Sequence, residues 1–204
     1  MKALFAVAIG LALASSASAQ LWVESGDAGD LPGTAQVPSG SGALLEISGT
    51  ISSNADADMY CITIPNPATF RATSCGGTTI DTQMWLFDPD GKGVSFDDDD
   101  PGGCGLQSTL TGVFVPGGGQ YYLAISTYSN DALNAAGQEI WNDQPFGVER
   151  TPDGAGAGDP FVVSWNGGGF SSGAYRISLV GVEYCGGPVP TIDSTWGKIK
   201  NTYK

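Results

Sequence analysis

An alternation of apolar and polar residues with a period of two recurs along this chain, and it constrains the fold more than any other feature. In DMYCITI (58–64), a tyrosine and two isoleucines share one parity, and methionine, cysteine and threonine fill the other. The segments 119–126 and 173–182 repeat the alternation, and both begin Gly-x-Tyr. Because successive side chains of an extended backbone point to opposite faces, each segment predicts a strand with one face toward a core.

Glycine and proline punctuate the sequence between these segments. The 204 residues include 31 glycines and 12 prolines, a composition that favours many turns between short strands. Further strands are predicted at 43–51, 68–74, 82–88, 94–96 and 109–115. The length suffices for one domain with a core. The sequence therefore predicts an all-β fold, an antiparallel β-sandwich over residues 43–185 with one long irregular insertion, 127–172.

Both ends of the chain differ from this body. Residues 1–19 combine Lys2, a short apolar run and a small-x-small ending, so we predict a signal peptide cleaved after Ala19. Residues 20–42 are polar and acidic, which predicts an extended lead-in. Residues 186–204 contain a linker and a basic amphipathic tail, either a docking segment or a terminus that folds back on the body. No later apolar run predicts a membrane span, so we expect a secreted or cell-surface protein.

The four cysteines follow this export signal, and in an oxidising compartment two disulfides are the default. Three connectivities are open from the sequence alone. We favour Cys75–Cys104, which joins two glycine-rich loops, together with Cys61–Cys185, which joins an early strand to the last one. A four-cysteine metal site is the alternative, and the lack of close CxxC pairs disfavours it.

The charge balance narrows the functional classes. The formal net charge is −13, and the sequence contains no histidine. An acidic body disfavours nucleic acid and anionic membranes as partners and favours cations. The lack of histidine removes Ser-His-Asp and Cys-His catalysis and histidine-ligated zinc. We therefore expect no enzymatic activity, and the remaining catalytic alternative is a glycan hydrolase that uses paired carboxylates.

Aspartates gather at three places that folding could bring together. Calcium takes about six to eight oxygen ligands, mainly carboxylates and carbonyls. Two aspartates lie two residues apart where a strand is predicted to start, so they share one side of the backbone, and the acidic lead-in could fold over them. The structural alternative is that aspartates favour turns and strand ends. The predicted calcium ligands are Asp27, Asp30, Asp56, Asp58, Asp97 and Asp98.

The predicted insertion carries several aromatic residues. Long loops that display aromatic rings often form binding surfaces, and the alternative is that the rings hold the loop on the body. Within the insertion, DALNAAGQEIW (131–141) favours a helical turn and PFVVSW (160–165) a strand. The candidate ligand-binding residues are Trp141, Phe146, Trp165 and Phe170.

The order of these motifs resembles the bacterial pre-peptidase C-terminal (PPC) domain family. The resemblance covers residues 24–184 and rests on GDAGD, DADMYCITI, TTIDTQMWLFDPDGKGVSFDDDD, GQYYLAIS and GAYRISL. It implies a jelly-roll-like sandwich. Some members of the family bind calcium between the lead-in and the first strands, which matches Asp27, Asp30, Asp56 and Asp58 here. Some members also bind collagen or polysaccharide.

These observations lead to one functional expectation and one alternative. We expect a secreted, non-catalytic calcium-binding module for binding or adhesion to an extracellular polysaccharide or protein surface. The alternative is a structural protein of the cell envelope that docks through the tail in residues 186–204.

Overall fold

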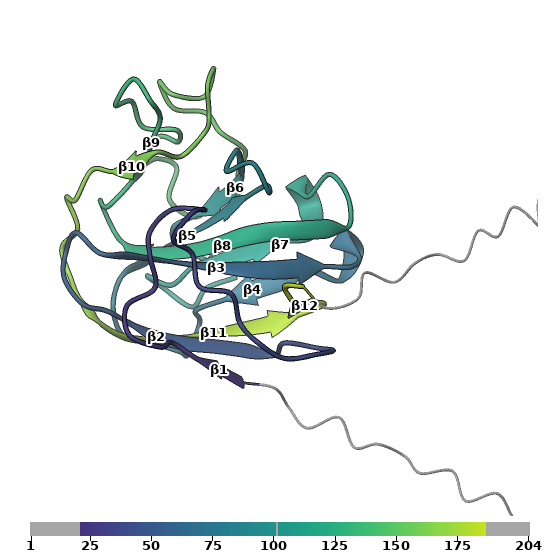
Figure 1. The fold of residues 1–204 in the computed structure, drawn as a ribbon. Helices are drawn as coiled ribbons and strands as arrows, with labels where there is room; N and C mark the ends of the chain where they lie inside the picture. Colours follow the sequence, from purple (N-terminus) through teal and green to yellow (C-terminus); the bar gives the residue numbers. More distant parts are fainter. Residues whose placement is uncertain (1–20, 101, 187–204) are drawn as a thin grey trace, which may run out of the picture.

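The computed structural model describes residues 21–100 and 102–186, which form two five-stranded sheets packed as a sandwich (Figure 1). The first sheet has the order β1 (Leu21–Val23), β2 (Glu46–Ile51), β11 (Gly173–Val180), β4 (Arg71–Thr73) and β7 (Thr109–Thr111). The second has the order β12 (Glu183–Tyr184), β3 (Ala57–Ile64), β8 (Gly119–Thr127), β5 (Thr82–Phe87) and β6 (Gly93–Asp97). The smaller elements are β9 (Ala132–Leu133), β10 (Ser164–Trp165) and the 3-10 helices η1 (Pro67–Thr69) and η2 (Gly112–Phe114).

The predicted all-β sandwich is confirmed, with one difference in strand direction. The pairs within the two large sheets are antiparallel except β1–β2, in which Leu21 lies opposite Glu46 in a parallel register. The lead-in therefore supplies an edge strand as well as extended chain. The signal peptide and the basic tail, predicted for 1–19 and 186–204, lie outside the described residues except for Gly186.

The helical turn predicted within 131–141 is wrong. Ala132–Leu133 form β9, and a turn follows. The side-chain oxygen of Asn134 accepts the N–H groups of Ala136 and Gln138, both at 3.0 Å. A local side-chain acceptor of this kind competes with helical hydrogen bonding, so the alanines do not start a helix.

The main core lies between the two large sheets and uses the predicted parity. Tyr60, Ile62 and Ile64 of β3 are buried there, and Tyr175 and Ile177 reach the same core from β11 in the opposite sheet. Each strand thus buries every second side chain against the facing sheet, as expected for aligned sandwich packing.

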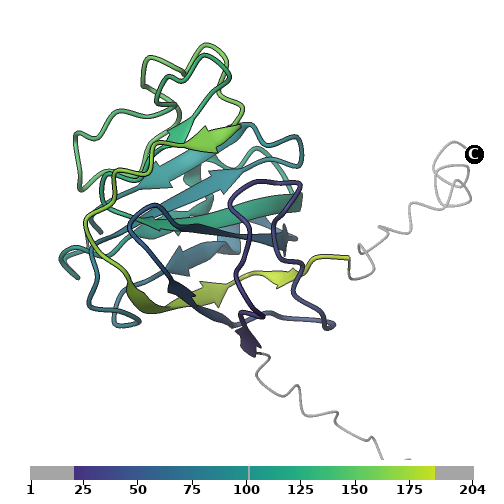
Figure 2. The ribbon, with the colours of Figure 1, turned by 60° about the vertical axis from the view of Figure 1, so that its left-hand side comes forward.

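A second hydrophobic core covers the outer face of the second sheet, where the insertion folds over it (Figure 2). Trp85 of β5 packs against Phe96 of β6 and against Trp141 of the insertion, with ring centroids 4.1 and 5.4 Å apart. Met59, which has the outward parity of β3, joins this cluster. Every residue of β3 is buried, since the lead-in and β12 also lie against this strand. The insertion is therefore part of the packed body.

Both disulfides favoured from the sequence are confirmed. Cys61 of β3 is bonded to Cys185 after β12, with Cα atoms 5.5 Å apart, and Cys75 is bonded to Cys104 with Cα atoms 5.7 Å apart. Among the described residues, no helix is long and apolar enough to cross a bilayer.

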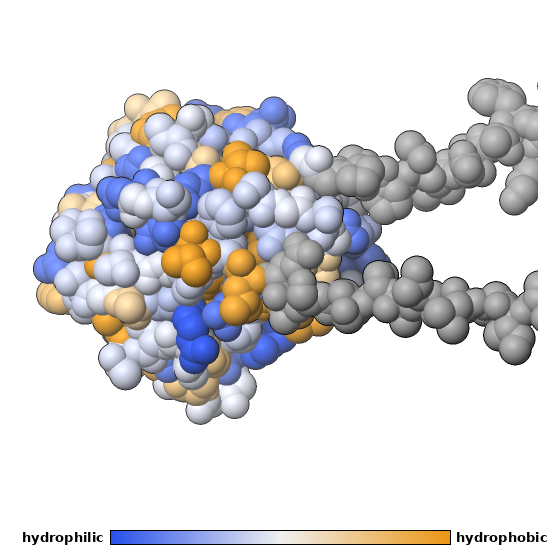
Figure 3. All heavy atoms as spheres, turned by 60° about the horizontal axis from the view of Figure 1, so that its bottom comes forward, coloured by the Kyte–Doolittle hydropathy of each residue, from blue (hydrophilic) through white to orange (hydrophobic). Residues whose placement is uncertain are grey.

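The two ends of the sandwich carry different features. Ala57 at the start of β3 and Thr82 at the start of β5 lie opposite Ser126 and Thr127, so both starts flank the end of β8. The described chain ends, at β1 and β12, lie at the other end of the molecule (Figure 1). The face turned forward in Figure 3 is largely hydrophilic, with separate hydrophobic residues.

Candidate metal centres

Carboxylates converge at two places in the described part of the chain. In each group, one oxygen from every carboxylate lies within 4.8 Å of the others. The first group, here called the lead-in site, consists of Glu24, Asp27 and Asp58. The second, here called the hairpin site, consists of Asp81, Asp98 and Asp99. A third group of close ligand atoms, Cys75, Asp100 and Cys104, is unsuitable for a metal because its two cysteines are joined in a disulfide.

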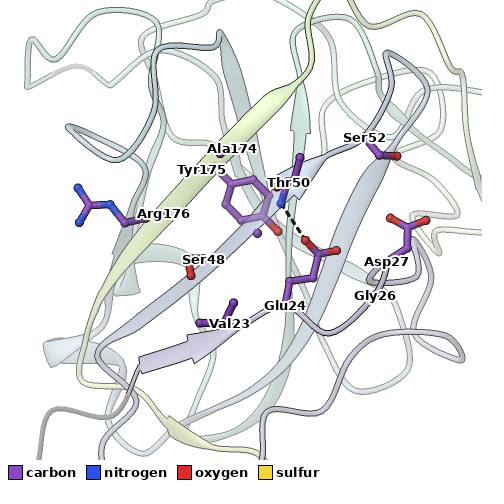
Figure 4. Close-up of a pocket in the computed structure, with 11 residues that line it drawn as sticks. Val23, Glu24, Gly26, Asp27, Ser48, Thr50, Ser52, Ala174, Tyr175 and Arg176 are labelled. Carbon is purple, nitrogen blue, oxygen red and sulfur yellow. Dashed lines mark hydrogen bonds between the residues drawn. The ribbon is translucent and has the colours of Figure 1, made fainter.

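The lead-in site is built where the chain leaves β1 and passes the end of β2. Glu24 accepts the N–H of Ala28 through Oε1 and the N–H of Thr50 through Oε2, both at 2.8 Å. Its carboxylate is therefore fixed to the lead-in on one side and to the first sheet on the other. Asp27 is exposed and lines the same open groove, where the Glu24 carboxylate lies between it and the Tyr175 ring (Figure 4).

Asp58 forms the buried wall of this site. Its side chain is fully buried, Oδ2 accepts the hydroxyl of Tyr175 at 2.6 Å, and Oδ1 has no hydrogen-bond partner among the described residues. The pKa of Asp58 is raised to about 8, mainly by burial, and the Tyr175 hydrogen bond offsets part of that rise. Negative charge on Glu24, Asp56 and Asp27 also contributes to the raised pKa. The carboxylate is ionised at neutral pH only if positive charge arrives.

A chain of hydroxyls supports Asp58 from behind. The Tyr60 and Tyr175 hydroxyl oxygens lie 2.6 Å apart in the core. Tyr175 donates its one hydroxyl hydrogen to Asp58. Its oxygen can therefore only accept from Tyr60, and Tyr60 is the donor of that pair. Burial raises the pKa of both tyrosines, which keeps the hydroxyls protonated. This order of donors fixes the position of the Asp58 carboxylate.

The structure places Asp30 and Asp56 beside the lead-in site rather than in its convergent group. The side chain of Asp56 accepts the N–H of Ser52 at 2.5 Å and so closes the turn before β3. Asp30 is exposed, and its main-chain carbonyl accepts the indole N–H of Trp165 at 2.8 Å. Both aspartates line a shallow cavity of about 270 Å³ with Asp27. Of the four aspartates predicted here, Asp27 and Asp58 have oxygens that converge.

The hairpin site lies at the open end of the β5–β6 pair. Asp81 immediately precedes β5 and Asp98 follows β6, and the antiparallel register brings these positions together. Asp97, predicted as a ligand with Asp98, points to the opposite face of the strand. There it accepts the N–H of Thr109 at 2.6 Å, and burial raises its pKa to about 7. Asp97 is therefore separate from the hairpin group.

The four aromatic residues proposed as a ligand surface have different environments. Trp141 is buried, 2% exposed, and its indole N–H donates to the carbonyl of Arg150, so its ring lies in the second core rather than at the surface. Trp165 is half-buried, and its ring lies edge-on to Trp85. Both indoles pack in or against the second core, where they cover β5.

Phe146 and Phe170 remain available at the surface of the insertion. Both rings lie 5.8 Å from the ring of Tyr128, Phe146 edge-on and Phe170 stacked. Phe170 is 72% exposed. These three rings, here called the aromatic cluster, lie next to the hairpin site, because Tyr128 and Phe146 line the same cavity as Asp81.

Sequence reasoning missed Glu24, Asp81, Asp99 and Tyr175 as site residues. Glu24 lies close in sequence to the GDAGD motif, and Asp81 and Asp99 lie at the two ends of the predicted hairpin. Their closeness in sequence to the predicted ligands could have identified all three. Tyr175 shares its parity with core residues, and its polar end offered no separate signal. The search for related proteins adds no further assignment: no family model matches the chain, and no curated protein matches it.

Proposed function

We propose that the chain is a calcium-stabilised, non-catalytic β-sandwich that acts as a binding module in an oxidising, extracellular environment. The observation that carries this proposal is the lead-in site. There Glu24 and Asp27 from the lead-in meet Asp58 of β3, and the Oδ1 atom of Asp58 is buried without a donor in the described structure. Hard cations with oxygen ligands suit such a group. The two disulfides support the oxidising compartment.

The electrostatics of the site favour a cation over mutual repulsion. Three carboxylates within 4.8 Å repel each other, and one of them is removed from water. Arg176 also lines the groove, but its guanidinium pairs with Glu46 at 3.7 Å and points away from the carboxylates (Figure 4). The positive charge that balances this group is therefore best supplied by an ion.

A bound ion would fasten the lead-in to the second sheet. The backbone already joins them, because Met59 donates its N–H to Gly29 and Cys61 donates to Gln36, at 3.1 and 2.8 Å. Coordination by Glu24 and Asp27 would add a contact to this attachment. At a calcium concentration about tenfold above the dissociation constant, linkage gives about 1.4 kcal/mol. That corresponds to a rise in Tm of roughly 3–6 °C for a domain of this size.

Thermal unfolding with calcium and with a chelator tests the proposal. We expect calcium at about 5 mM, above the weak affinities of extracellular modules, to raise the Tm of the wild type. In Asp58→Asn and Asp27→Asn, most of the calcium-dependent increase in Tm that is due to the lead-in site should be absent. Asp90→Asn removes the same charge from an exposed turn and is the matched control. A Tm that calcium does not change would refute the calcium assignment.

The aromatic cluster is the surface best suited to a larger partner. Tyr128, Phe146 and Phe170 present adjacent rings beside acidic groups. Exposed aromatic side chains of this kind supply contact area in recognition sites. We propose this cluster as the place where an extracellular polysaccharide or protein surface binds. Phe170→Ala should weaken retention on the bound surface, whereas Phe161→Ala, which alters another exposed ring of the insertion, should not. Equal retention of both variants would argue against the cluster.

A further inference from the structure

The Asp98 carboxylate is the most unusual polar group outside the lead-in site. Asp98 is 1% exposed, and among the described residues neither of its carboxylate oxygens has a hydrogen-bond partner. Oδ1 of Asp81, in the same group, also lacks a partner there. Buried polar atoms are paired in nearly all native structures, so several unpaired acceptors together indicate that a positive species is bound among them.

The charges around Asp98 increase this need. The pKa of Asp98 is raised to about 8, mainly by burial, and the neighbouring carboxylates also contribute: Asp99, Asp81, Asp97 and Asp131. The two carboxylate oxygens of Asp131 already accept amide N–H groups, from Gln83 and from Asn166. Asp131 adds negative potential and leaves the three carboxylates of the hairpin site to bind a ligand.

We propose that the hairpin site is a second binding site for a divalent cation of the calcium class, held by Asp81, Asp98 and Asp99. An adjoining cavity of about 240 Å³, lined by these residues with Tyr128 and Phe146, leaves room for water to complete the coordination shell. The hairpin site and the lead-in site share the same ligand chemistry but no residues, so each can be tested without the other.

The position of the site gives the ion a mechanical role. Tyr128 donates its N–H to the carbonyl of Asp81 at 3.2 Å, and Asp99 donates to the carbonyl of Phe146 at 3.3 Å. The insertion is thus tied to the β5–β6 hairpin at both ligand positions. An ion bound there would hold the aromatic cluster in place, whereas the ion of the lead-in site would hold the lead-in on the other side of β8.

Equilibrium dialysis of the full chain against radioactive calcium tests the second site. The measurement uses about 5 mM calcium in about 0.15 M salt, which screens non-specific attraction to the acidic surface. We expect about two ions per wild-type chain and about two for Asp90→Asn, the exposed control. Asp98→Asn should bind about one ion and Asp58→Asn about one. Asp99→Asn, a milder change at a half-buried position, should weaken the second affinity at least tenfold.

The outcomes separate the two sites. Loss of one ion in Asp98→Asn with retention of the other supports the hairpin site, and loss in Asp58→Asn alone supports only the lead-in site. If Asp98→Asn does not fold, as judged by its circular dichroism, Asp99→Asn decides. Wild-type and Asp99→Asn proteins that bind calcium identically would overturn the proposal. A wild type that binds one ion, lost in Asp58→Asn, would also overturn it and would indicate that the hairpin carboxylates share a proton.

Discussion

Replacement of the two core tyrosine hydroxyls, singly and together, gives the sharpest test of the network behind Asp58. Tyr175 donates to Asp58 and accepts from Tyr60. Tyr175→Phe therefore removes a hydrogen bond to a charged group and leaves the Tyr60 hydroxyl without its partner. Tyr60→Phe removes only the first donor of the hydrogen-bonded series. Both changes delete one hydroxyl group, but the order of donors predicts unequal losses of stability.

The expected costs follow from what each change leaves unpaired. A hydrogen bond to a charged group contributes about 1.5–3 kcal/mol, and a buried orphan hydroxyl costs about 1–3 kcal/mol. Tyr175→Phe should thus lower the free energy of unfolding by about 3–5 kcal/mol, and Tyr60→Phe by about 1 kcal/mol. The double variant has no orphan hydroxyl, so the two changes together should lower the free energy of unfolding by only about 2–3 kcal/mol. Tyr60→Phe is therefore expected to stabilise the Tyr175→Phe protein.

Urea unfolding followed by tryptophan fluorescence, with both disulfides intact, measures these differences. The measurement is best made at about pH 9, above the folded-state pKa of Asp58, about 8, so that the carboxylate is ionised with or without metal. Additive, equal costs for the two single changes would refute the assigned order of donors. A destabilising effect of Tyr60→Phe in both backgrounds would refute it as well.

Three further predictions concern the whole body. In chelator, the free energy of unfolding should fall as pH rises from about 4 to 8. The reason is that buried carboxylates with pKa values raised from 3.8 to about 8 bind more protons in the folded chain than in the unfolded one. Saturating calcium should flatten this pH dependence, and a pH dependence that calcium does not change would contradict the metal assignments. Removing the disulfide Cys61–Cys185, which spans 124 residues, should cost about 1 kcal/mol more stability than removing Cys75–Cys104, which spans 29. Loop-closure entropy gives about 4.9 kcal/mol for the first and about 3.6 kcal/mol for the second. Urea unfolding of the two double-alanine variants measures this difference, and the reverse ranking would show that loop entropy does not dominate. Trp141→Ala should lower the free energy of unfolding by about 3–5 kcal/mol in the same assay, and a cost below about 1 kcal/mol would show that the second core is not a packed unit.

The period-two alternation was sufficient to predict most strands, because residues such as Ile62 and Ile177 face one shared core. The burial of Met59 on the outer side of β3 was not predictable from that pattern, since it depends on a cover supplied by residues far along the chain. The same cover explains Trp141: its ring is in a second core, and local sequence does not distinguish a buried loop ring from an exposed one.

The candidate sites were predictable only in part. Asp58 was recognised because it lies two residues after Asp56 at the start of a predicted strand, and Asp98 because it lies in an acidic run. Their partners Glu24 and Asp81 come from other elements, brought close by the parallel β1–β2 pair and by the β5–β6 register. Such non-local convergence depends on the pairing of strands, which single-sequence patterns do not fix.

The location of the described chain ends determines the orientation that the protein would have if it were attached to a surface through either end. Leu21 lies beside the start of β2, and Cys185 is bonded to Cys61 near the end of β3, so both exits are at one pole of the molecule. The carboxylate groups occupy the opposite pole. Attachment through either exit would turn the carboxylates outward, toward whatever approaches from the medium. If the two carboxylate groups bind calcium as proposed, changes in external calcium would then act on the end of the molecule that is farthest from the attachment.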